Sequence, residues 1–218
     1  MSTQRFSIGE AISFGWKTTW QHFGFLLLVM VIVGVINNGA NIVTRIVGED
    51  SVAVIMFASL AFFVVSLLVQ VGLITILLKL VRGQHAEFGD LFSGANRLFP
   101  YFLGCLLYGL IVLGGLLLLI IPGIIWGIRF QFYSYYIIDK GLGPMDALKA
   151  SWHTTKGVSW TLFLFGIVSG LINILGVLLL FIGLLATIPI TSIAYSYIYE
   201  RLARGSKEAA ASSTAPAA

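Results

Sequence analysis

The sequence predicts an all-α integral membrane protein with six transmembrane helices. Only 10% of its 218 residues are charged and 58% are hydrophobic, whereas a soluble domain has about 25% charged residues. Several apolar runs reach the roughly 20 residues that a spanning helix needs. These runs of Leu, Ile and Val are unbroken, which contradicts a closed barrel whose strands alternate over roughly 10 residues.

Six apolar segments fit this plan. No cleavage site of a signal peptide follows the first segment, so we expect this segment to stay in the mature protein. Pro122 and Gly123 predict a tight turn between the third and fourth spans. Two G-x-x-x-G motifs, at 123–127 and 166–170, predict close helix crossings. The spans are expected at about 23–43, 52–80, 99–121, 124–138, 158–181 and 184–199.

Short amphipathic stretches precede the first, third and fifth spans, at residues 7–22, 87–97 and 144–156. Each stretch places an acidic residue ahead of two apolar residues, and a potentially cationic residue follows seven positions later. We therefore predict helices that lie at the membrane interface. Ser7 and Glu10 fit a capping box at the start of the first helix.

The same pattern divides the chain into three repeats, each an interfacial helix followed by a two-span hairpin. Residues 117–123 resemble 178–183, and YIID at 136–139 matches YIYE at 197–200. We predict a membrane domain over residues 1–205 and a disordered low-complexity tail at 206–218. The repeats are expected at about 7–82, 87–139 and 144–203.

The basic residues predict the orientation. Eleven Lys and Arg residues fall on one side of the six spans, and Arg45 alone falls on the other. The positive-inside rule then places both termini in the cytoplasm. The basic residues are spread over short loops, which suits contact with lipid headgroups and argues against binding of nucleic acid.

Residues 121–157 combine an Ile-Pro-Gly segment, an aromatic-rich span, the sequence DKGLG and then DALKASWHTTKG. This pattern resembles the polytopic membrane domain at the N-terminus of some bacterial glycerophosphodiester phosphodiesterases, and related bacterial inner-membrane proteins of unknown function. The resemblance implies a six-span fold in the bacterial inner (plasma) membrane. No phosphodiesterase barrel follows the sixth span, so we expect no hydrolase activity from this chain.

Polar residues within the predicted spans are the candidate functional residues. A charge inside a span, such as Arg129, marks either a functional site or a side chain that reaches for lipid headgroups. Asn and Gln side chains either line a polar cavity or join helices through hydrogen bonds worth about 0.6 kcal/mol each. Asp139, beside Lys140, is expected to form an interfacial ion pair. The candidates are Arg129, Gln131, Asn37, Asn38, Gln70, Asn173 and Asp139.

The sequence has no H-E-x-x-H motif, no paired Cys and His pattern and no nucleophile elbow, so we expect no metal and no cofactor. Cys105 is the single cysteine, which excludes an intrachain disulfide. The sequence favours a non-enzymatic protein that organises the membrane or associates with lipids or protein partners. The alternatives are a small transporter or channel with a polar path near Arg129, and a membrane-embedded enzyme. Homo-oligomerisation and binding to another membrane protein stay open.

Overall fold

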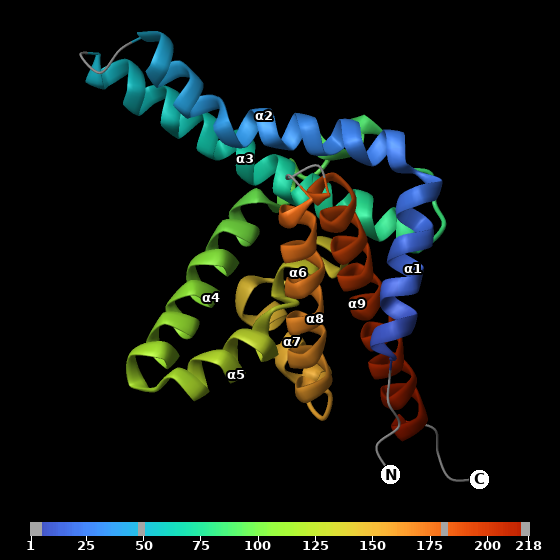
Figure 1. Ribbon diagram of the computed structural model, residues 1–218. Coiled ribbons are helices and arrows are strands. Elements are labelled where there is room, and N and C mark those ends of the chain that lie inside the picture. Colours follow the sequence, from blue (N-terminus) through green and yellow to red (C-terminus); the bar gives the residue numbers. More distant parts are fainter. Residues whose placement is uncertain (1–5, 48–50, 180–182, 215–218) are drawn as a thin grey trace.

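The protein is helical throughout the part of the chain that the structure describes. The computed structural model describes residues 6–47, 51–179 and 183–214, and these ranges contain nine α-helices, two short 3₁₀-helices and no strand (Figure 1). The elements are α1 (Ile8–Gln21), α2 (Phe23–Val47), α3 (Val52–Val81), η1 (Phe88–Phe92), η2 (Ala95–Arg97), α4 (Leu98–Leu118), α5 (Ile120–Phe130), α6 (Tyr133–Lys140), α7 (Pro144–Thr155), α8 (Ser159–Leu178) and α9 (Leu184–Thr214).

Four helical segments are long and apolar enough to cross a membrane: α2, α3, α8 and the run that ends with α4. The predicted fourth span is broken. It consists of α5 and α6, which have 11 and 8 residues and are each too short to span alone. Gln131 and Phe132 form the turn between them.

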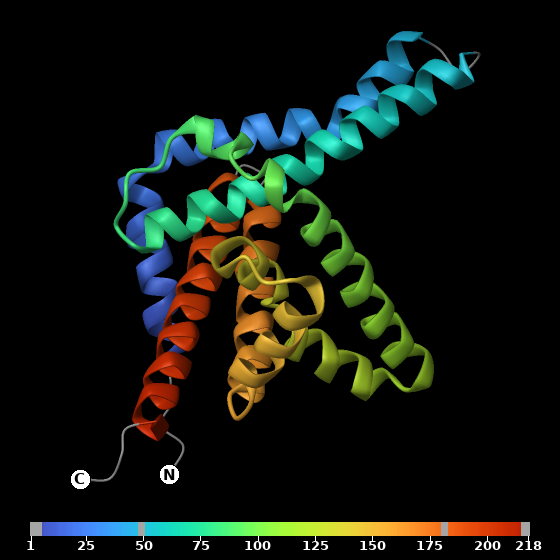
Figure 2. The same cartoon turned by 180° about the vertical axis from the view of Figure 1, so that it is seen from behind.

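Most of the helices pair as hairpins (Figures 1 and 2). α2 pairs with α3, α4 with α5 and α8 with α9, while α1 packs along α9. The hairpins point in different directions, and the far end of the α2–α3 pair extends away from the other helices. The six predicted spans therefore do not lie as one parallel bundle in this structure.

Two buried clusters hold the helices together. One is rich in aromatic residues and joins α6, α7 and α9, with Phe132, Ile137 and Tyr199 fully buried. The other joins α2, α3 and η1 through residues such as Val29 and Leu91. Most other large apolar side chains of α2 to α5 are exposed, which suits a surface that faces lipid rather than water.

The predicted turn at Pro122 and Gly123 is wrong. The chain turns at Leu119, which has extended backbone angles, and Pro122 lies in the first turn of α5, where a helix tolerates proline. Gly123 is buried where α5 packs on α4. A Cβ on Gly115 would lie 2.8 Å from the Cα of Gly123, so these two glycines permit the close approach.

The two G-x-x-x-G motifs do not mark helix crossings as predicted. A Cβ on Gly127 would meet no atom closer than 3.8 Å. A Cβ on Gly166 or Gly170 would have nothing within 4 Å. Of these four glycines, only Gly123 lies at a close helix contact.

Helices α1 and α7 confirm two of the three short helices that precede spans. Residues 87–97 instead form η1 and η2. Glu87 and Asp90 make a reciprocal capping box at the start of η1, and Gly89 and Gly94 interrupt the segment. The capping box predicted for α1 is absent, since the Ser7 side chain makes no capping bond. The Glu10 carboxylate accepts hydrogen bonds from Tyr197 and Arg201 of α9 instead.

Helix α9 also continues beyond its predicted span, as far as Thr214. It therefore includes most of the tail that was predicted to be disordered, and residues 215–218 lie outside the described part. Alanine has the highest helix propensity of any residue, and the tail contains three consecutive alanines at 209–211.

Candidate functional site

A pocket of about 360 Å³ lies between α3, the α5–α6 junction, α8 and α9. Its apolar wall comes mainly from Leu73, Ile74 and Leu77 of α3 and from Leu162 and Phe165 of α8. The polar groups on its other walls are carried by Gln131, Tyr135, Ser169, Asn173, Thr191, Ser192 and Tyr195. We call this space the polar pocket.

Three polar atoms of the polar pocket are buried and have no hydrogen-bond partner among the described residues: Gln131 Nε2, Ser169 Oγ and Asn173 Oδ1. The second polar atom of each of the two amides, Gln131 and Asn173, has a hydrogen-bond partner. Tyr195 Oη donates to Gln131 Oε1 at 2.6 Å, and Asn173 Nδ2 donates to Thr191 Oγ1 at 3.4 Å. An unpaired buried polar group costs about 1–3 kcal/mol, so this pocket favours a guest that supplies hydrogen bonds.

The break between α5 and α6 places Gln131 at the polar pocket, and α7 stabilises the break. Ser151 Oγ donates to the carbonyl of Arg129 at 2.8 Å and accepts from the backbone N–H of Phe132 at 3.1 Å. Thr155 Oγ1 also donates to the Arg129 carbonyl, at 3.1 Å. Two hydroxyl side chains thus replace the helical hydrogen bonds that are missing at the turn.

One arginine joins the C-terminal ends of α3 and α6 to the middle of α9. Arg82, which follows α3, donates from Nη2 to Asp139 Oδ1 of α6 at 2.7 Å and to Glu200 Oε2 of α9 at 2.8 Å. Lys140 Nζ lies 2.6 Å from the second oxygen of Asp139, and Tyr199 Oη donates to that oxygen at 2.9 Å. We call Arg82, Asp139 and Glu200 the charge cluster.

The charge cluster keeps both carboxylates ionised. Burial by itself raises the pKa of Asp139, but hydrogen bonds from Lys140, Arg82 and Tyr199 outweigh it and hold the pKa below its ordinary value. The pKa of Glu200 is lowered in the same way. Burial opposes the shift, and the hydrogen bonds from Arg82 and Arg204 produce it.

The charge cluster lies about one helical turn beyond the polar pocket on the same three helices. Leu77, Tyr135 and Tyr195 line the pocket, and Arg82, Asp139 and Glu200 follow them by four or five positions. The polar pocket and the charge cluster are therefore two layers of one three-helix junction.

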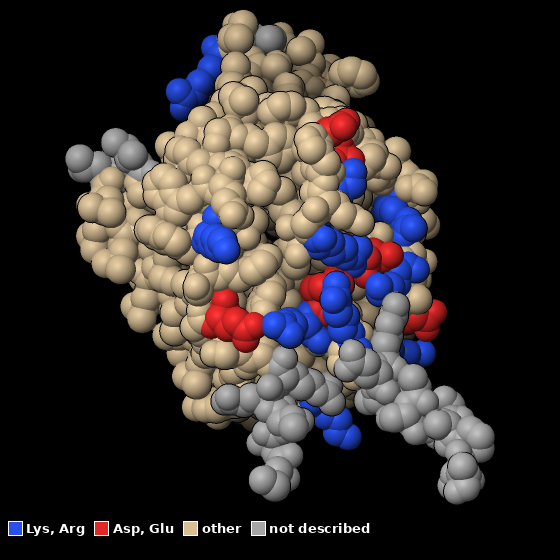
Figure 3. Space-filling model, turned by 90° about the vertical axis from the view of Figure 1, so that its right-hand side faces the viewer, with Lys and Arg blue, Asp and Glu red and all other residues tan. Residues whose placement is uncertain are grey.

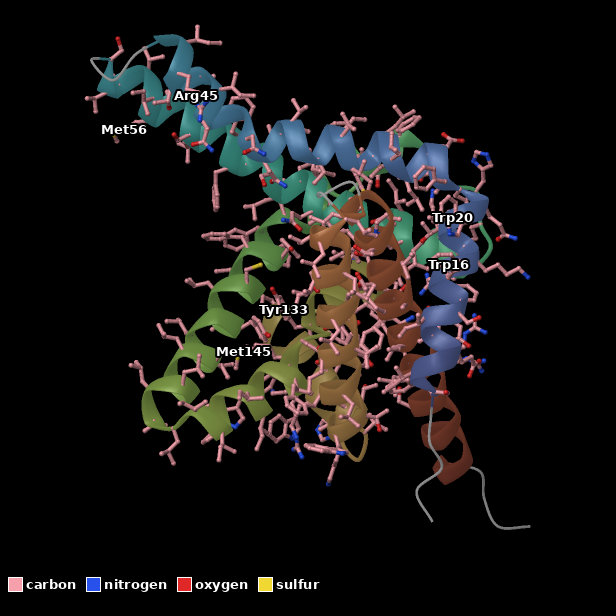
Figure 4. The ribbon with its side chains drawn as sticks, in the orientation of Figure 1. Trp16, Trp20, Arg45, Met56, Tyr133 and Met145 are labelled. Carbon is pink, nitrogen blue, oxygen red and sulfur yellow. The ribbon has the colours of Figure 1, made fainter. Side chains whose placement is uncertain are left out.

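The charged side chains are unevenly distributed over the surface. In Figure 3, most of those visible gather in one part of the face, where acidic and basic groups are neighbours. Trp16 and Trp20 lie on α1, whereas Arg45 and Met56 lie at the far end of the α2–α3 hairpin (Figure 4). Arg45, the one basic residue predicted on the outer side, is thus far from Trp16 and Trp20 (Figure 4).

Arg129 does not line the polar pocket. Its guanidinium carbon lies 4.2 Å from the centre of the Trp152 ring of α7, which is a cation–π contact, and its buried Nε has no partner among the described residues. Trp152, Lys149 and His153 border a groove of about 590 Å³ whose other walls are apolar. The remaining lining residues are Leu110, Ile111, Gly114, Leu118, Trp126 and Phe130.

The structure separates the seven residues singled out in the sequence. Gln131 and Asn173 share the polar pocket, and Asp139 belongs to the charge cluster. Asn37, Asn38 and Gln70 are exposed on the α2–α3 hairpin. Asn37 accepts a hydrogen bond from Ser66, and Asn38 donates to a carbonyl of its own helix. The structure therefore does not gather Arg129 and all the predicted amides at one site.

Sequence reasoning missed Ser169, Tyr195 and Arg82. Serine and tyrosine in apolar helices carry no distinctive pattern, so nothing in the sequence pointed to the first two. Arg82 and Asp139 end the first and second predicted repeats, and Glu200 lies near the end of the third. A comparison of all three repeat ends, rather than the last two, would have paired this arginine with the acids.

The described helices and their apolar surface define an all-helical protein with four helices suited to crossing a membrane. The chain belongs to the DUF7847 family, a domain of unknown function whose model matches residues 101–217. The uncharacterized proteins Mb2590 of Mycobacterium bovis and Rv2560 of Mycobacterium tuberculosis are each 26% identical to it over 238 residues, which cover 94% of this chain and 71% of the relative. No solved structure matches the chain.

Proposed function

We propose that this chain is a non-enzymatic, multi-pass protein of the bacterial inner membrane that binds anionic phospholipid in the groove between α4, α5 and α7. The observation that carries the proposal is an apolar groove with basic groups at one end. Lys149 and His153 border it from α7, and Arg129 stacks on the bordering Trp152.

The two parts of a phospholipid match the two parts of this groove. An acyl chain fits the apolar walls, which continue into exposed leucines and isoleucines around the α4–α5 turn. A phosphate suits the basic end, because arginine and lysine are the preferred partners of phosphate oxygens. A lysine near an anionic membrane surface contributes about 1 kcal/mol, so the headgroup charge decides which lipid binds.

Lipid binding can be measured by native mass spectrometry of the purified full-length protein with phosphatidylglycerol or phosphatidylcholine. We expect preferential retention of phosphatidylglycerol, and at least roughly fivefold weaker retention in Lys149→Glu. Lys17→Glu is the matched control, since Lys17 is exposed on α1 and does not border the groove. Equal retention of the two lipids by the wild type, or equal effects of both substitutions, would contradict the proposal.

We propose further that the chain has six spans in three repeats, with both termini in the cytoplasm. Equivalent repeat ends supply Arg82, Asp139 and Glu200 to one cluster. Two hairpins each have a close contact between two glycines near the tip. The pairs are Gly115 with Gly123 in α4–α5, and Gly176 with Gly183 in α8–α9. The shared fold with the membrane domain of glycerophosphodiester phosphodiesterases remains part of this proposal and rests on the resemblance of residues 121–157.

Thiol labelling of intact cells tests this topology. In a Cys105→Ala background, an impermeant maleimide should label Ser51→Cys, which lies at the start of α3 after the predicted outer loop. Gln84→Cys, which follows the cytoplasmic end of α3, should be labelled only after lysis. Labelling of Gln84→Cys in intact cells would show the opposite orientation and contradict the proposal.

A further inference from the structure

The polar pocket is separate from the lipid groove and shares none of its lining residues. We infer that the polar pocket binds a small uncharged amphipathic molecule that carries a carboxamide or hydroxyl group. The inference rests on three features: the unpaired polar atoms, the absence of charge among the described lining residues, and the apolar wall.

The unpaired atoms specify the hydrogen bonds that the guest must make. Gln131 Nε2 is a free donor, Asn173 Oδ1 is a free acceptor and Ser169 Oγ can act as either. A complementary group must therefore accept one hydrogen bond and donate another. Carboxamides and hydroxyls do both, whereas an ether or a ketone leaves Asn173 without a donor.

The surroundings exclude a charged guest. None of the described residues that line the pocket is charged. Arg82, Asp139 and Glu200, about one turn beyond the pocket, are paired with one another, and Lys79 of α3 is paired with Asp90. A charged guest would lose its hydration without gaining a counter-ion, and this loss costs far more than hydrogen bonds return.

The size and the apolar wall call for a short hydrocarbon part. A volume of about 360 Å³ lies within the ~300–1,000 Å³ of small-molecule sites and exceeds the share of one water, about 30 Å³, many times. Water alone would pair the polar atoms, but it would also cover Leu73, Leu77 and Phe165. A guest with a few carbon atoms covers these side chains and pairs the polar atoms together.

Butyramide is a suitable probe, because it joins a three-carbon chain to a carboxamide. Butyrate and butylammonium have similar size and opposite charges. In saturation-transfer difference NMR with the full-length protein in detergent, we expect a signal for butyramide and none above background for either ion. Asn173→Leu and Gln131→Leu should weaken butyramide binding roughly fivefold or more, which corresponds to the loss of one hydrogen bond.

Asn38→Leu is the matched control, since it makes a comparable amide-to-leucine change at an exposed position of α2. A circular-dichroism melt checks that each variant is folded, and Ser169→Ala replaces any leucine variant that is not. Equal signals for butyramide and butyrate would overturn the inference. So would a signal that every folded pocket variant leaves unchanged, or no signal at all, as expected for a pocket that holds only water. Lys149→Glu should leave butyramide binding unchanged, so this result is independent of lipid binding.

Discussion

Arg82 and Glu200 are 118 positions apart in the chain, and two nitrogen atoms of the arginine contact one oxygen of the glutamate, at 3.0 and 2.8 Å. The same arginine binds Asp139, whose side chain is only 6% exposed. The C-terminal ends of α3 and α6 and the middle of α9 therefore meet at one cation. Most of the other contacts between the hairpins are apolar, so the charge cluster is the most specific of them.

Replacing Arg82 with methionine should destabilise the fold by about 1–3 kcal/mol, because it leaves two largely buried carboxylates without their shared partner. The free energy of unfolding can be measured by titration with sodium dodecyl sulfate in mixed micelles. Arg204→Met is the control. Arg204 pairs with Glu200 on the surface of a single helix, and such exposed pairs contribute less than about 1 kcal/mol. Equal losses in the two variants would refute a special role for Arg82.

The charge cluster should make stability depend on acid. Both carboxyl pKa values are lowered in the folded protein, so the folded state holds fewer protons than the unfolded state. The stabilisation is complete above the ordinary carboxyl pKa values, about 4, and is lost as the pH falls through the lowered values. Melting temperatures should be flat from about pH 8 to 5 and fall below about pH 4. Arg82→Met should show a shallower fall, and a parallel curve would contradict this origin.

The contact between Gly115 and Gly123 predicts different effects for alanine substitutions at Gly123 and at Gly127, one turn later. A Cβ at Gly123 would lie 2.7 Å from the backbone nitrogen of Leu116, so Gly123→Ala must push α4 and α5 apart. We expect a loss of about 1–3 kcal/mol from such overpacking. Gly127→Ala should be neutral or slightly stabilising, because the position has room and alanine favours helix. The same titration measures the free energy of unfolding of both variants. A larger loss for Gly127→Ala than for Gly123→Ala would contradict the close contact of α4 and α5 at Gly123.

Ser151 supports the broken helix, so Ser151→Ala should cost about 1–3 kcal/mol by leaving the backbone N–H of Phe132 unpaired. The substitution should also weaken butyramide binding, because Gln131 lies in the turn that Ser151 stabilises. Ser159→Ala is the control, since the Ser159 hydroxyl bonds only to a carbonyl one turn earlier. Unfolding and probe binding are measured on both variants. Similar results would show that the α5–α6 turn does not depend on Ser151.

The sequence predicted the helical class and the limits of α2, α3 and α8 well, because apolar runs of about 20 residues leave few alternatives. It did not predict the break at Gln131. The residues that stabilise this break, Ser151 and Thr155, lie in another helix and are ordinary in their own sequence context. The turn before α5 was missed because Pro122 also suits the first turn of a helix.

The candidate site was predicted only in part. Gln131 and Asn173 were chosen as polar residues in apolar segments and share the polar pocket, but the same criterion also selected Asn37, Asn38 and Gln70, which are exposed. Polarity alone does not report which face of a helix meets another helix. That information comes from tertiary packing, which brings Leu77, Tyr135 and Tyr195 to the same space.

The position of Arg82 along the chain also has a consequence for biosynthesis. Ribosomes make α3 before α6 and α9, so Arg82 is present before Asp139 and Glu200 are synthesised. During that interval the first hairpin has a cation but no acidic partner, and each later hairpin supplies one carboxylate. The charge cluster is complete only when α9 has been made. The last helix therefore fixes the position of the first hairpin. In a nascent chain that stops before Glu200, Arg82 has Asp139 as a partner but lacks its second carboxylate.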